Sequence, residues 1–224
     1  TDAKFTHVWL LKNGKWYLKS AISFDHQQKF GKMSAAAPVK KAEPKPYTIY
    51  DLTLLGHSLR LDYRAQVQRR FDDDCSDAPE LPVSELPDEV LRYLLPTRYC
   101  ESDLLVAVAR RTFGAVPLGH QRVREICRWV HQNIEYRIGS TDATTTARDV
   151  FVQRAGVCRD FAHLSIALCR ALNIPARLVS GYARFDEPPP DFHAVFEAYL
   201  GGRWVLFDPT QMVAVDQLVR VAHG

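Results

Sequence analysis

The sequence lacks arginine before Arg60 and lysine after Lys45, although it contains nine lysines and twenty arginines. Nine lysines against three acidic residues give residues 1–46 a formal charge of +6, whereas twenty arginines against 23 acidic residues give residues 47–224 a charge of −3. Folding does not require such a separation, since exposed positions accept either basic residue. We interpret the two parts as segments with different coding histories.

Other absences exclude whole classes of protein. No run of 18 apolar residues occurs, so we expect no transmembrane helix and no membrane partner. Residues 1–15 do not have the successive charged, apolar and small-residue regions of a signal peptide, which favours a cytoplasmic protein. The formal net charge of +3, without a basic stripe interleaved with aromatics, argues against nucleic-acid binding. A length of 224 residues, 46% of them hydrophobic, suits one packed domain with room for a smaller one.

Cysteine is scarce and irregularly spaced. The five cysteines form an odd set without a CxxC pair, so neither a disulfide framework nor a structural zinc site is expected. Cys127 and Cys169 lie in apolar helical patterns and are predicted to be small buried hydrophobes. Three consecutive acids, residues 72–74, are interpreted as a solvated loop and not as a metal site. We expect no metal and no cofactor.

The first 32 residues read as a β-hairpin of separate origin. Two strand-like runs, 5–12 and 15–24, flank Asn13-Gly14, a dipeptide that favours a tight type I′ turn. Residues 33–46 (MSAAAPVKKAEPKP) have the composition of a linker, and residues 47–224 are predicted to form the main domain. The segment THVWLLKNGKWYLKSAISFDHQ resembles the closing hairpin of SnoaL-like α+β folds, a resemblance to which we attach no activity.

The main domain begins with helical patterns. Residues 47–70 predict one or two strands. Five helices are expected: over 84–95, over 102–113, over 119–136, from Thr145 or Thr146 to Gly156, and over 158–172. Ser84 caps the first, which has Pro87 in its first turn. Ser102 caps the second, and the apolar face of that helix consists of Leu104, Leu105, Val108 and Ala109. In the third of these, the apolar residues recur every three or four positions: Val123, Ile126, Cys127, Val130 and Ile134. Asp149 is placed to complete a capping box in the fourth.

The pattern then changes to strands. Strands are predicted over 176–183, 192–200 and 203–207, with Gly201-Gly202 as a tight turn between the last two. Several helices followed by an antiparallel sheet indicate an α+β fold.

Cys158 lies where one helix ends and another begins. Free backbone N–H groups and the positive end of the helix dipole both stabilise a thiolate at that place, and they lower the pKa of a cysteine. The same N–H groups can donate to an oxyanion. Cys158 is therefore a candidate nucleophile, although a half-buried structural cysteine remains an equal alternative on this segment alone.

His193 and Asp208 favour the catalytic alternative. If Gly201-Gly202 forms a two-residue turn, His193 faces Thr210 and Asp208 faces Val195 across the hairpin. His193 and Asp208 are then diagonal neighbours on one face of the sheet. A thiolate, a base within reach and an acid that orients the base are what nucleophilic acyl transfer requires.

The segments that carry these residues resemble the bacterial transglutaminase-like superfamily of papain-like cysteine enzymes. The resemblance is carried by GVCRDFAHLSIALCRALNIPARLVSGY and PDFHAVFEAYLGGRWVLFDPT, and it extends from about residue 80 to residue 224. It implies a nucleophile at Cys158, a histidine at His193 and an acid at Asp208, on a helix packed against an antiparallel sheet. Relatives usually have a longer β-rich N-terminal region and further strands after the equivalent of RVAHG.

Five residues around the candidate site receive weaker assignments. Gly156 would let a substrate approach the backbone. Asp160, in the first helical turn, is expected to be structural, and Arg159 is either a surface residue or a substrate contact. Trp204 is predicted to be a core aromatic, with shielding of the site as the alternative, and Tyr182 is placed near the cleft.

The leading hypothesis is cysteine-dependent acyl transfer or hydrolysis at glutamine amides or peptide bonds, through a thioester, with a protein or peptide as substrate. The residues leave open whether water or an amine resolves the thioester. A non-catalytic binding or scaffold module that retains the fold is the alternative. Arylamine N-acetyltransferase chemistry uses the same three residue types but ranks last, because no segment suggests a coenzyme A site.

Overall fold

The structure is a computed structural model. It describes the backbone of residues 2–12, 15–23, 47–55, 58–66, 75–183, 191–214 and 217–224, and the side chains of 75–183, 192–214 and 217–224. The chain divides into two compact units: Thr1–Arg70 with Arg184–Phe192, and Phe71–Ala183 with His193–Gly224. No helix in the described ranges is long and apolar enough to cross a bilayer.

The first unit contains an antiparallel sheet in the order β2-β1-β4-β3. Its strands are β1 (Asp2–Lys12), β2 (Lys15–Ser23), β3 (Tyr47–Leu55) and β4 (Ser58–Gln66). Lys12 pairs with Lys15, as the predicted hairpin requires; the Asn13-Gly14 turn itself lies outside the described residues. Because β1 also pairs with β4, the sheet continues past residue 46. The separate origin of residues 1–32 and the linker at 33–46 stay predictions, and residues 72–74 lie outside the described ranges.

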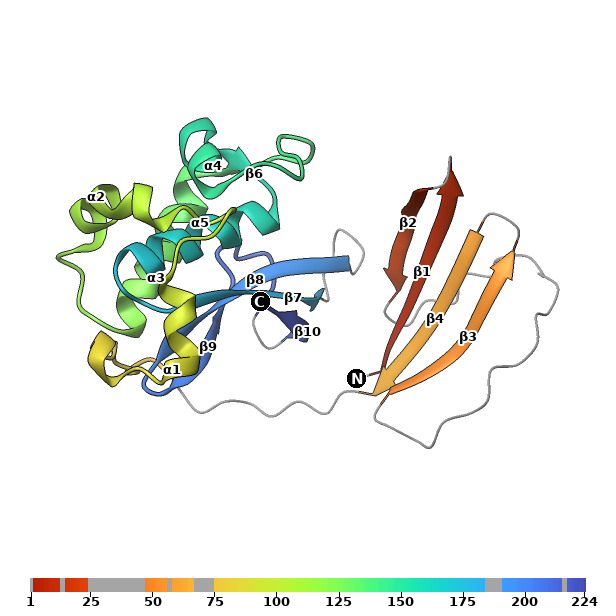
Figure 1. Cartoon of the computed structure of the whole chain (residues 1–224), viewed down its shortest axis with the longest axis horizontal. Coiled ribbons are helices and arrows are strands. Elements are labelled where there is room, and N and C mark those ends of the chain that lie inside the picture. The colour runs from red at the N-terminus through yellow and green to blue at the C-terminus, as the bar shows by residue number, and fades with distance from the viewer. Residues whose placement is uncertain are drawn as a thin grey trace. The chain divides into compact units, whose positions relative to one another are not determined.

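The second unit confirms the α+β class, with helices packed on a sheet of order β10-β7-β8-β9 (Figure 1). The longer helices are α2 (Ser102–Phe113), α3 (His120–Asn133), α4 (Ala147–Gln153) and α5 (Cys158–Ala171). The strands are β7 (Ala176–Ala183), β8 (Asp191–Leu200), β9 (Arg203–Phe207) and β10 (Leu218–His223). β5 (Glu135–Tyr136) and β6 (Ala155–Gly156) form a short parallel pair, and β6 lies directly before the start of α5 in the chain.

Two helix starts differ from the prediction. The helix expected over 84–95 is broken into a 3₁₀ turn (Val83–Glu85), α1 (Asp88–Leu91) and a second 3₁₀ turn, η2 (Arg92–Leu94). The cause is Pro87, which disfavours helical backbone at the residue before it: Leu86 is extended, with ψ of 137°. Ser102 is the first residue of α2 and not its cap, since Glu101 occupies that position.

The predicted cap of α4 is correct, but its predicted end is wrong. Thr146 and Asp149 form the capping box. The helix ends at Gln153, because Arg154 adopts left-handed backbone with φ of 60°. Gly156 therefore does not close the helix and lies in β6. The short strands β5, β6 and β10 were not predicted, since two to six residues give too little alternation to recognise.

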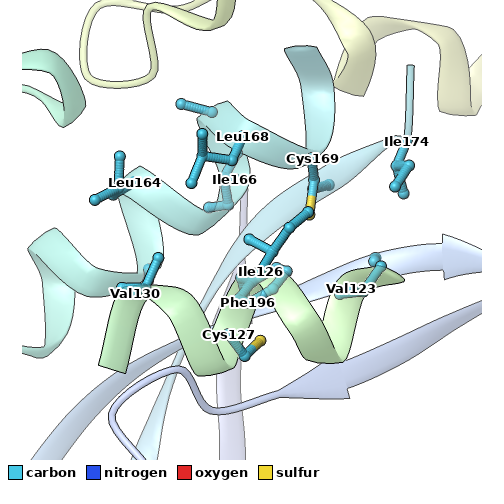
Figure 2. Packing of buried hydrophobic residues seen from close by; sticks show 14 of the residues in the cluster. Val123, Ile126, Cys127, Val130, Leu164, Ile166, Leu168, Cys169, Ile174 and Phe196 are labelled. Carbon is cyan, nitrogen blue, oxygen red and sulfur yellow. The ribbon is translucent and has the colours of Figure 1, made fainter. Parts of the chain in front are cut away.

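Helix α5 is the centre of the packed core. Every residue from Asp160 to Ala171 is buried, and α2, α3, α4 and β7 pack around it. In Figure 2, Val130 of α3 lies nearest Leu164 of α5, and Ile126 of α3 lies nearest Cys169 of α5; all four belong to one buried cluster. The apolar positions predicted for α3 are all buried, as are Cys127 and Cys169. Leu104 of α2 differs from its prediction, because it is exposed while Leu105, Ala109 and Phe113 face the core.

The β8–β9 hairpin has the register that its turn predicts. Phe196 pairs with Phe207 and Leu200 with Arg203, and both turn glycines have positive φ. Residues 78–80 hold this turn beside α3. Gly201 N–H donates to the Pro79 carbonyl at 2.8 Å and His120 N–H to the Ala78 carbonyl at 2.9 Å.

The Phe196→Ala variant tests how much the hairpin depends on the core. Phe196 is fully buried and stacks on Phe207 with 5.6 Å between ring centroids. Removing a buried phenylalanine ring typically costs about 3–5 kcal/mol through lost transfer energy and a residual cavity. We expect a loss of this size in the free energy of unfolding measured by urea denaturation. Leu118→Ala, at an exposed leucine, is the control and should change it by less than about 0.5 kcal/mol.

Candidate active site

Cys158 is the first residue of α5, as predicted. Its side chain is half-buried. The chain reaches Cys158 through β6, whose Gly156 pairs with Tyr136 of β5. The carbonyl of Val157 accepts the N–H groups of Asp160 and Phe161, at 2.8 and 3.1 Å. The first turn of the helix is therefore closed directly behind the thiol.

The environment of Cys158 stabilises its thiolate. Burial raises the pKa of the thiol, but hydrogen bonds from His193 and from the backbone N–H groups of Ala194 and Arg159, with Coulombic attraction to His193, outweigh burial and lower it below its ordinary value. Strand β8 thus approaches the start of α5 with both a ring and a backbone donor. The pKa of the thiol is therefore shifted in the direction that favours a thiolate, mainly through His193.

His193 lies between Cys158 and Asp208. Its Nε2 is 3.0 Å from Oδ2 of Asp208, which leaves Nδ1 for the thiol. Burial lowers the pKa of His193, but the hydrogen bonds to Asp208 and Cys158 and the Coulombic attraction of both raise it to about 9. A lowered thiol pKa beside a raised imidazole pKa favours the thiolate–imidazolium form of the pair.

Asp208 is held by a residue to which the sequence assigned no role. Oδ1 of Asp208 accepts from the Thr210 hydroxyl at 2.7 Å and from the Thr210 N–H at 2.9 Å. Oδ2 accepts from the Val213 N–H at 3.3 Å in addition to His193. The hairpin register placed Thr210 opposite His193, and the two side chains do meet, with 3.3 Å between Oγ1 and Nε2. That register was the available signal for Thr210.

Asp160 is structural, as expected. One oxygen, Oδ2, accepts from the Val157 N–H at 2.9 Å and from the Thr141 hydroxyl at 2.6 Å. Gly156 makes this arrangement possible, because a Cβ there would lie 2.7 Å from Cβ of Asp160. The structure therefore gives Gly156 a packing role, and its predicted role in substrate approach stays a prediction.

Arg159 is turned toward the loop before α4. Its guanidinium donates to Oδ1 of Asp160, to the Thr141 hydroxyl and to the carbonyl of Asp142. These contacts tie the loop to the first turn of α5. A substrate contact by Arg159 stays untested.

The two predicted aromatics differ in their surroundings. Trp204 packs edge-on against Tyr93 and Tyr199, with the Arg177 guanidinium 4.0 Å from its ring centroid. Trp204 is half-buried at the edge of this cluster with η2, and its predicted role stays a prediction. Tyr182 is buried in β7, opposite Val219 of β10, and its predicted place near the cleft stays a prediction.

Asp208 also lines a cavity. This cavity of about 1020 Å³ is lined by polar residues of α3, including Arg124 and Arg128, and by Asp208 and Gln211. Neither Cys158 nor His193 lines it. Within the described side chains, no three His, Cys, Asp or Glu residues are grouped as a metal site requires.

The Gly156→Ala variant tests the packing under the first turn of α5. The new methyl group would displace the Asp160 side chain from the Val157 N–H, since 2.7 Å is too short for two carbon atoms. Overpacking of this kind costs about 1–3 kcal/mol. We expect a lower free energy of unfolding in urea and slower alkylation of Cys158. Wild-type values for both would contradict the packing role.

Alkylation of Cys158 by iodoacetamide across pH tests the thiolate–imidazolium pair. We expect a midpoint below about 8.5, the pKa of a free thiol, because the pKa of Cys158 is lowered. In His193→Ala the midpoint should rise above that of the wild type, since burial still raises the thiol pKa and the opposing partner is gone. His131→Ala, at an exposed histidine of α3, is the matched control. Equal midpoints in all three proteins would show that the pair does not form.

The chain is similar to solved structures and to curated proteins. The crystal structure of a "Putative Cysteine Protease" from Cytophaga hutchinsonii is 32% identical, with a TM-score of 0.67 over 100% of this chain and 80% of that one. An uncharacterised protein of Mycobacterium leprae is 32% identical over 160 residues, which are 66% of this chain and 55% of that protein. An uncharacterised protein of Mycobacterium bovis is 35% identical over 108 residues, 42% of this chain and 34% of that protein.

The chain thus spans about half of the first mycobacterial relative and a third of the second. The family description "Transglutaminase-like superfamily" matches residues 106–209, a range that contains Cys158, His193 and Asp208. The α+β core and the identity with the Cytophaga protein agree with this match. The chain belongs to the transglutaminase-like superfamily.

Proposed function

We propose that the chain catalyses cysteine-dependent acyl transfer or hydrolysis at glutamine amide or peptide bonds, through a thioester on Cys158. The observation that carries the proposal is the position of His193. Its ring hydrogen-bonds Asp208 at 3.0 Å on one side and Cys158 on the other. The thiol of Cys158 stands at the N-terminus of a helix, where a thiolate is stabilised.

Formation of the thioester needs three groups in sequence. The Cys158 thiolate attacks the carbonyl carbon, and the carbonyl oxygen becomes an oxyanion. Helix geometry leaves the N–H of Cys158 without an acceptor in its own helix, so this donor is available to the oxyanion. His193 then gives its Nδ1 proton to the leaving nitrogen, the C–N bond breaks, and ammonia or an amine departs.

Resolution of the thioester reverses the roles. Neutral His193 removes a proton from water or from a primary amine, which attacks the thioester carbon. The C–S bond breaks and returns the electron pair to sulfur, restoring the thiolate–imidazolium pair. Asp208 stays ionised throughout and keeps the ring oriented. Water gives hydrolysis and an amine gives transfer, and both products are consistent with this site.

The name of the Cytophaga relative, a cysteine protease, supports peptide bonds as substrates, and the family description supports glutamine amides. We propose a protein or peptide substrate for both reactions.

Incubation with a glutamine-containing peptide, with and without a primary amine, tests the activity. We expect ammonia release or peptide cleavage by the wild type, and an amine adduct if transfer occurs. Cys158→Ala should abolish all products, because no other described group can form the thioester at this site. Cys75→Ala, at a cysteine outside the candidate site, is the control and should keep full turnover. Turnover that survives in Cys158→Ala would sink the proposal.

A further inference from the structure

Thr210 makes three polar contacts with the histidine–aspartate pair. It is buried, with 4% of its surface exposed, and it follows Asp208 after a single proline. Its hydroxyl oxygen lies 2.7 Å from Oδ1 of Asp208, 3.3 Å from Nε2 of His193 and 3.2 Å from the backbone nitrogen of Met212. Because this hydroxyl is buried among three polar groups, the chemistry of each group decides whether the hydroxyl donates a hydrogen bond to it or accepts one from it.

A hydroxyl has one proton to donate and two lone pairs that accept. Oδ1 of the Asp208 carboxylate can only accept, so it takes the hydroxyl proton. The Met212 N–H can only donate, so it occupies one lone pair. The remaining lone pair faces His193, and a contact there is favourable only if Nε2 carries a hydrogen.

The same residue fixes the rotation of the carboxylate. Aspartate is loosely restricted about its last side-chain bond, since that torsion has a broad minimum. Two donors from Thr210, the hydroxyl and the backbone N–H, hold Oδ1. Oδ2 is thereby left toward His193 and the Val213 N–H. All four acceptor positions of the carboxylate are filled by donors.

We propose that Thr210 is a positioning residue, whose hydroxyl keeps a hydrogen on Nε2 of His193 and so makes Nδ1 the atom that exchanges a proton with Cys158. This inference rests on the proposed function and adds to it the residue that fixes the histidine tautomer. Asp208 alone also favours hydrogen on Nε2, but a carboxylate that rotates does not hold the ring in one direction. Thr210 supplies that restraint together with a second acceptor for the same hydrogen.

Thr210→Val, Thr210→Ala and Thr210→Ser separate the hydroxyl from the rest of the side chain. In the valine and alanine variants Nε2–H loses its second acceptor, and Oδ1 of Asp208 keeps only the Thr210 N–H as a donor, so the ring is held less firmly and the imidazolium is less stabilised. We expect the midpoint of Cys158 alkylation to move to higher pH by about one unit, the usual effect of one hydrogen bond to a charged group. We also expect proton–nitrogen NMR to show the ring Nε2–H signal of His193 in the wild type and to lose it in these variants, through faster exchange with water. Thr210→Ser keeps the hydroxyl and should restore both.

Controls distinguish this role from a loss of stability. Thr146→Val removes the capping hydroxyl of α4 and should lower stability without moving the alkylation midpoint. A wild-type midpoint and a protected Nε2–H in any folded variant without the hydroxyl would overturn the inference, as would a shifted midpoint in Thr210→Ser. An unactivated thiol in the wild type would instead overturn the proposed function. On substrate, the valine variant should lower kcat about tenfold with little change in KM.

Discussion

The position of the nucleophile depends on the burial of helix α5 on all of its sides. An amphipathic helix on a surface has one face fixed, whereas α5 is enclosed by three helices and a strand. Rotation or translation of such a helix would open voids in the core, which close packing makes costly. The thiol at its first residue is therefore held in place by contacts that lie well behind it, and the site itself need not supply that rigidity.

Enclosure of α5 places polar residues inside the core, and each has a particular reason to be there. Ser165 donates to the carbonyl of Phe161 at 2.8 Å, one helical turn back. Arg170 donates to the carbonyls of Ala176 and Leu95, which joins the end of the helix to β7 and to η2. His163 stacks on Tyr99 with 5.3 Å between ring centroids, and burial lowers its pKa to about 4. It therefore stays neutral where His193 is charged.

Much of the fold follows from local patterns. The apolar period of α3, the Thr146–Asp149 box and the Gly201-Gly202 turn each depend on residues close together in the chain, and each was predicted correctly. The pairing of His193 with Asp208 was also predictable, because a two-residue turn fixes the register of everything beyond it.

What escaped prediction depends on contacts between distant segments. Strand β10 forms by pairing with β7, and the apolar–polar alternation of its own six residues is too weak to predict a strand. Glu197 is buried because Arg177 and Arg220, from two other strands, lie 2.8 Å from its carboxylate, a pairing that no spacing indicates. Thr210 was visible as the residue opposite His193, but its hydrogen bonds depend on how the chain turns after Asp208.

The bond between Gly201 and the Pro79 carbonyl gives the β8–β9 hairpin a second support. One end of the hairpin bears His193 and Asp208, and the other end, the turn, is fastened to residues that also bind the start of α3. Strand β8 is also bonded to β7 in the sheet, so the hairpin is held along one side as well as at its turn. A strand pair held in both places cannot pivot away from the sheet at its turn. The distance between the histidine and the cysteine helix is thus protected against that motion.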